Sequence, residues 1–116
     1  DHKRKIGAIN IIFTNDSNLL KINRKYLGRN NYTDIITFNY NEKDKISADL
    51  YISVERVRYN AVIFKVEEKE ELNRVIIHGI LHLVGFKDKQ NKEKMEMKKM
   101  EDFYLRNIYK KGSENL

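Results

Sequence analysis

The sequence contains no cysteine, no proline and no tryptophan. The absence of cysteine excludes a disulfide scaffold, a thiolate metal site and a cysteine nucleophile. Without proline, and with only five glycines, no segment has the composition of an interdomain linker. Because 116 residues suffice for one compact domain but not for two, we expect residues 1–116 to form a single domain.

Long hydrophobic runs are also absent. The longest apolar stretch, Val75–Phe86, has about half of the roughly 20 residues that span a bilayer, and two histidines interrupt it. The charged first residues lack the apolar segment of a secretory signal, so we expect no membrane association and take the cytoplasm as the default location. Since the chain begins with Asp1 and not with methionine, we also expect that N-terminal elements of a longer protein are missing.

Positive charge predominates. The chain has 23 Lys and Arg residues against 17 Asp and Glu residues, a formal net charge of +6, which favours anionic partners such as nucleic acid. Many of these cations lie in the last third of the chain, where they alternate with Glu93, Glu96 and Glu101. The same arrangement is typical of a solvated helix face, and this is the interpretation that we prefer for these lysines.

The first half of the chain predicts strands and one helix. A β-branched run, Ile9–Phe13, indicates a strand with at least one buried face. A helix should follow from a cap near Asn15 to Gly28, with Leu19, Ile22 and Tyr26 at its apolar positions. Residues 35–40 and 49–54 alternate in polarity and predict an antiparallel hairpin.

The second half predicts three helices. Ser53 should cap a helix that reaches about Phe64, with Val54, Val57, Ala61 and Val62 as its apolar positions. The next helix begins near Glu67, is apolar on nearly every side from Val75 to Val84 and ends at Gly85, which indicates a buried central helix. Met97, Met100, Tyr104 and Ile108 mark a last amphipathic helix. This order predicts an α+β fold in which a small mixed sheet packs against several helices.

Two histidines lie on the predicted central helix. The four-residue spacing of His78 and His82 places both imidazoles on one face, one turn apart, where they can share a metal ion. An imidazole in an apolar setting needs partners, because each unsatisfied polar group costs about 1–3 kcal/mol. The alternative is a pair of core histidines that bond to the backbone or to a carboxylate such as Asp49.

Asp88 is the candidate third ligand. Gly85 lets the chain leave the helix sharply, so that a side chain three residues later can turn back toward the histidines. Two neutral nitrogens and one carboxylate leave coordination positions open, as catalytic zinc sites do, and favour hydrolysis. We therefore predict one divalent metal ion, zinc by preference, on His78, His82 and Asp88. A solvated Asp88 or a helix cap remains the alternative.

The position after His78 disfavours a peptidase, so a metal-dependent hydrolase of a small molecule or peptide is the least supported class. Zinc peptidases of the H-E-x-x-H type carry glutamate there as general base, whereas this chain has Gly79. Asp34 and Asp49 are other candidates for a general base, but a turn hydrogen bond or a contact with a metal-bound histidine is the better explanation of each. The general base is therefore left unassigned.

The motifs around these residues resemble the YbeY family of bacterial metal-dependent endoribonucleases. The stretch His78–Asp88 is similar to the family motif H-G-x-L-H-L-x-G-[YF]-D-H, with Asp88 in the place of the last histidine. Three upstream segments are similar to further family motifs: Ile22-Asn23 with Tyr26, Thr33–Phe38, and Asp49–Ile52. Together they extend over most of residues 9–101.

The resemblance implies an α+β fold, one zinc-like ion in a cleft, cleavage of single-stranded RNA, and a role in ribosomal RNA processing and ribosome maturation with the small subunit as partner. Leu27 stands where the family usually has an arginine, and Arg24 or Arg29 is a candidate replacement. Tyr32, Tyr40 and Tyr51 are candidates for stacking on bases, although packing in the core or at its rim is the better explanation of each. The alternative function is a ribosome-associated RNA-binding module with a structural or weakly catalytic metal.

Overall fold

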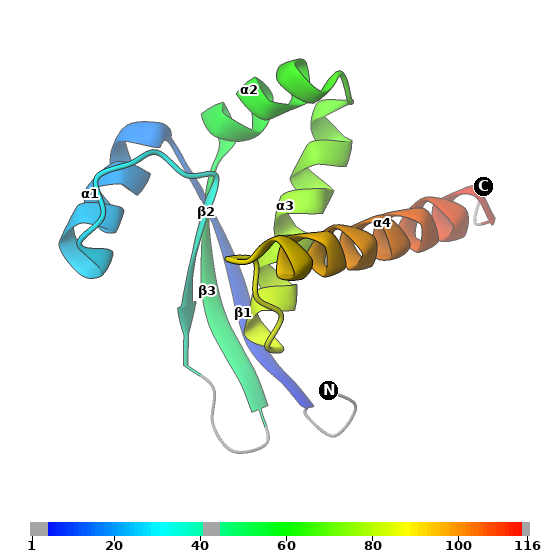
Figure 1. Ribbon diagram of the computed structural model, residues 1–116, viewed down its shortest axis with the longest axis horizontal. Coiled ribbons are helices and arrows are strands. Elements are labelled where there is room, and N and C mark those ends of the chain that lie inside the picture. The colour runs from blue at the N-terminus through cyan, green and yellow to red at the C-terminus, as the bar shows by residue number, and fades with distance from the viewer. Residues whose placement is uncertain (1–4, 41–44, 115–116) are drawn as a thin grey trace.

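The computed structural model describes residues 5–40 and 45–114, and it contains a three-stranded mixed sheet and four helices (Figure 1). The strands are β1 (Lys5–Thr14), β2 (Ile35–Asn39) and β3 (Lys45–Ser53). The helices are α1 (Asp16–Leu27), α2 (Val54–Phe64), α3 (Glu68–Leu83) and α4 (Asn91–Glu114). The predicted α+β class is confirmed.

The central strand of the sheet is β3. It pairs in parallel with β1 and antiparallel with β2, so the predicted hairpin is confirmed, although its turn lies outside the described residues. The ends of α1 and α2 are capped by the residues that the sequence predicts. The Asn15 side chain accepts a hydrogen bond from the Asn18 amide, the Ser53 hydroxyl accepts one from the Arg56 amide, and Gly28 ends α1 with a φ of 63°.

The sheet has helices on both faces. On one face, Tyr26 of α1 makes an edge contact with Phe38, which makes another with Tyr51. On the opposite face α3 packs closely because Gly79 has no side chain: a Cβ atom there would lie 2.6 Å from Cδ1 of Ile35. A glutamate at this position would be driven into the interface between helix and sheet, which agrees with the exclusion of the peptidase motif.

The helix α3 is the centre of the molecule. It contacts β2, β3, α2 and α4, and Figure 1 shows α4 crossing in front of it. Its buried side chains Val75, Ile77, Leu81 and Leu83 belong to the clusters that form the core. The expectation of a buried central helix is therefore correct.

Several positions expected inside are exposed. Val62 is 76% exposed at the end of α2, and Tyr26 and Tyr104 are also exposed; Leu105, one residue further on, is buried in place of Tyr104. The side chain of Ile108 lies outside the described part. In β1, Ile9 packs against the core but Ile11 and Phe13 are exposed, so the expectation of a buried face holds only in part. The reason is that α3 packs mainly on β2 and β3, and β1 lies at the other edge of the sheet.

Candidate metal centre

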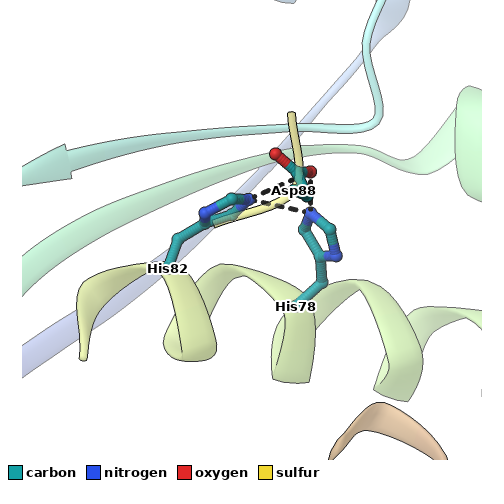
Figure 2. A group of neighbouring side chains, drawn as sticks. All are labelled: His78, His82 and Asp88. Carbon is teal, nitrogen blue, oxygen red and sulfur yellow. Dashed lines mark hydrogen bonds and ion pairs between the residues drawn. The ribbon is translucent and has the colours of Figure 1, made fainter. Parts of the chain in front are cut away.

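His78 and His82 lie one turn apart on α3, and their rings meet edge to face with centroids 4.6 Å apart (Figure 2). The two Nε2 atoms are 3.0 Å apart. Both side chains are about one third exposed, so the pair is neither sealed in the core nor fully solvated. The helical spacing alone accounts for this arrangement.

Asp88 comes back to the two rings through the turn that ends α3. Gly85 has a φ of 107°, and the amide of Phe86 donates to the Leu81 carbonyl, which closes the turn. Oδ2 of Asp88 then lies 3.2 Å from Nε2 of His78 and 3.3 Å from Nε2 of His82. The structure thus brings together all three residues singled out as metal ligands.

The outer nitrogens of both rings are already bonded. Nδ1 of His82 lies 3.0 Å from the carbonyl oxygen of Phe86, and because a carbonyl only accepts, this nitrogen carries the proton. Nδ1 of His78 lies 2.6 Å from a carboxylate oxygen of Glu101 in α4 and donates likewise. In the neutral rings, both Nε2 lone pairs therefore face the Asp88 carboxylate.

Three electron-rich atoms within 3.3 Å of one another repel unless a cation or a proton lies among them. A tetrahedral zinc centre with bonds of about 2.0–2.1 Å separates its donor atoms by about 3.3 Å. The donors of this cluster match that separation, and two imidazoles with one carboxylate are a known donor set of catalytic zinc sites. Among the described residues, this is the one cluster whose His and carboxylate atoms meet the geometry of a shared ion.

Glu101 is a residue of the candidate site that the sequence interpretation misses. The charge pattern predicts it on the solvated face of the last helix, yet it is 7% exposed and bonds to both His78 and Arg74. Its hydrogen bond is the main reason why the pKa of His78 is raised, against the opposing effect of burial. A signal was present, because Glu101 lies four residues from both Met97 and Leu105 on the apolar stripe of α4.

Asp49 does not have the role suggested for it. Its carboxylate accepts hydrogen bonds from Asn10 and Tyr40, and Glu101 is the carboxylate that contacts the histidine pair. Asp34, in contrast, lines the cleft described next.

A cleft of about 650 Å³ opens beside the histidines, with His78 and Asp88 among its lining residues. Its polar residues include Asp34, Asn60 and Glu71, and Asn60 hydrogen-bonds to both carboxyl groups. Burial raises the pKa of Asp34, and burial together with the nearby Asp34 raises that of Glu71 to about 7. The cleft therefore holds carboxyl groups that retain protons more readily than exposed ones.

The cationic side chains of the cleft come from α3 and α4. Arg74 is held by Glu101 and Asp102, while Lys94 and Lys98 are exposed. Neither Arg24 nor Arg29 is among the described residues that line the cleft. Neither arginine therefore lies in the cleft as a replacement for the one expected at position 27.

Fold and cluster together define a small α+β protein with a candidate metal centre on a helix that packs against a mixed sheet. The model of a known family, endoribonuclease YbeY, matches residues 1–109. The chain belongs to the YbeY family, which confirms the assignment predicted from the motifs and places the protein among the RNA hydrolases.

Individual similar proteins support the family assignment. A Karelsulcia muelleri protein named endoribonuclease YbeY is 48% identical over 106 residues, which cover 91% of this chain and 75% of the relative. One with the same name from Flavobacterium psychrophilum is 50% identical over 100 residues, 86% of this chain and 71% of the relative. A Thermotoga maritima protein solved in solution superposes with a TM-score of 0.64 at 29% identity, over 92% of this chain and 71% of that one.

Proposed function

We propose that this protein is a metal-dependent endoribonuclease that cleaves single-stranded RNA. The observation that carries the proposal is the convergence of two imidazole nitrogens and one carboxylate oxygen within 3.3 Å, at the side of a cleft. Membership of the YbeY family supports RNA as the substrate. His78, His82 and Asp88 are the proposed ligands, and zinc is the proposed ion because of the donor set.

When bound, the ion supplies a Lewis acid that polarises a phosphoryl oxygen or lowers the pKa of water, and activation of a ribose 2′-hydroxyl is equally compatible. Side chains and one backbone carbonyl of the protein have the remaining roles. Glu101 and the Phe86 carbonyl hold the Nδ1 protons and so keep both Nε2 atoms available. Lys94 and Lys98 neutralise charge on the substrate. Glu71 can hold or release a proton near neutral pH, since its pKa is about 7.

We further propose that the substrate is ribosomal RNA, that the activity serves ribosome maturation with the small subunit as partner, and that the protein acts in the cytoplasm as one domain. The family resemblance and the net charge of +6 support these points. Among the helices of residues 5–40 and 45–114, none combines the length and the hydropathy that a bilayer crossing requires.

His82→Ala tests the proposal. The variant should fold, because the side chain is about one third exposed, but it should lose stoichiometric metal and nuclease activity. Metal content by elemental analysis and cleavage of a single-stranded RNA, with and without chelator, are the readouts. Gln90→Ala is the matched control, since Gln90 is exposed and lies in the segment that carries Asp88.

Retention of one metal ion per chain and of full cleavage by His82→Ala would contradict the proposal. Metal in the wild type without RNA cleavage would instead favour the alternative, an RNA-binding module with a structural ion. The structural observation behind that alternative is Leu27, which is 47% exposed at the position where an arginine was expected.

A further inference from the structure

Two exposed tyrosines from distant parts of the chain lie beside one arginine. The guanidinium carbon of Arg56 is 5.2 Å from the ring centre of Tyr32 and 4.9 Å from that of Tyr59. Both tyrosine side chains are 56% exposed. Cation–π contacts of this kind hold aromatic rings in place on a protein surface.

Arg56 is itself fixed. Its Nη2 atom lies 3.0 Å from a carboxylate oxygen of Asp16, and its side chain is largely buried. Asp16 in turn accepts a hydrogen bond from Ser53, the residue that caps α2. Among the described residues, Nε of Arg56 is the buried side-chain polar atom that has no hydrogen-bond partner. Burial of a donor without a partner is unfavourable, so the arginine is held here at some expense to stability.

Tyr32 and Tyr59 are close in sequence to two residues that line the cleft of the candidate metal centre. Tyr59 directly precedes Asn60, and Tyr32 is two residues before Asp34. The side-chain nitrogen Nδ2 of Asn60 lies 3.4 Å from a carboxylate oxygen of Asp34, and both residues line the cleft together with His78. One hydrogen bond therefore joins the segments that carry the two rings, at a wall of the cleft.

Rings that are exposed yet already held suit stacking on a nucleobase. Proteins bind single-stranded nucleic acid by combining aromatic platforms with cationic side chains. Lys94 and Lys98 are exposed cations among the residues that line this cleft. The faces of bases inside a duplex are covered by their neighbours, so a platform of this kind favours single strands. The formal net charge of +6 favours an anionic partner such as RNA over a neutral apolar surface as the partner of the platform.

We propose that Tyr32 and Tyr59, positioned by Arg56, form a stacking platform that binds unpaired bases of the RNA next to the metal centre. This inference rests on the proposed function and extends it: it names the residues that select single-stranded substrate. Tyr32 was among the candidates for stacking from the sequence. Tyr59 and the link between them are apparent only in the structure.

The test is the double variant Tyr32→Leu/Tyr59→Leu. Its affinity for a fluorescently labelled single-stranded RNA of about ten nucleotides should fall by about 5- to 150-fold for each base that stacks, since that is the range of base–aromatic stacking. KM for cleavage should rise by a similar factor while kcat stays near the wild-type value. Tyr32→Phe/Tyr59→Phe should restore the affinity, because phenylalanine retains the ring. Tyr104→Leu is the matched control, an exposed tyrosine on α4 outside the lining of the cleft.

A second measurement uses the wild-type protein alone. RNA that carries the fluorescent base 2-aminopurine at one position after another should lose emission on binding wherever the base stacks on the platform. Quenching at one or two neighbouring positions supports the platform, and its absence at every position overturns it. Quenching that persists unchanged in the leucine variant would also overturn it.

The outcomes separate the platform from the proposed function. If the wild type binds and cleaves the RNA and the leucine variant behaves like Tyr104→Leu, the platform is wrong and the proposed function stands. If the wild type neither binds nor cleaves single-stranded RNA in the presence of zinc, both are wrong.

Discussion

Glu71 should make the protein less stable as pH rises toward neutrality. The side chain is 3% exposed, and burial and the nearby Asp34 raise its pKa from 4.5 to about 7, although Arg74 opposes the change. Between these two values the folded protein retains a proton that the unfolded chain has lost. The contribution of Glu71 to stability is therefore fully present below about pH 4.5 and is lost as pH rises to about 7.

The magnitude follows from the two pKa values. At about 1.4 kcal/mol for each pH unit, a rise from 4.5 to about 7 corresponds to about 3 kcal/mol of unfolding free energy. Glu71→Gln keeps the size and polarity of the side chain but cannot ionise. The variant should match the wild type near pH 4.5 and exceed it by up to about 3 kcal/mol at pH 8.

Urea unfolding of chelator-treated protein at a series of pH values measures this difference. Glu67→Gln is the matched control, because Glu67 is exposed and lies just before the same helix. Its stability curve should follow that of the wild type. If Glu71→Gln also runs parallel to the wild type from pH 4.5 to 8, the assignment of a raised pKa to this buried carboxyl group is refuted.

Two further predictions concern the support of the centre and the core. Glu101→Gln should weaken zinc binding by about 10- to 100-fold, which is the usual effect of losing a carboxylate that hydrogen-bonds to a metal-binding histidine. Glu96→Gln, at an exposed position of α4, should leave zinc binding unchanged. A titration with a zinc-binding dye compares the two variants. Leu50→Ala should lower the free energy of unfolding by about 2–5 kcal/mol, because Leu50 is fully buried beneath α3. Urea unfolding measures this loss, and a value well below this range would show that the sheet is not packed as described.

Much of the candidate site follows from short-range features of the sequence. The spacing of His78 and His82 fixes their common face once the helix forms, since helical geometry repeats every 3.6 residues. Gly85 alone permits the turn that returns Asp88 to them, because its φ of 107° is strained for other residues. The caps at Asn15 and Ser53 act within three residues. Each of these interactions connects neighbours in the chain, so the amino-acid order contains the information.

Contacts between distant segments depend on the tertiary structure. Glu101 reaches His78 across 23 residues only because α4 packs against α3, and Asn60 meets Asp34 across 26 because α2 lies beside the segment before β2. The same packing brings Tyr32 to Arg56, and the edge position of β1 leaves Phe13 exposed. The sequence by itself determined the elements and the pair of imidazoles with its returning carboxylate. The tertiary packing decided which residues hydrogen-bond to the histidines, which line the cleft and which aromatic rings are exposed. Local propensity does not encode which faces of the elements pack together.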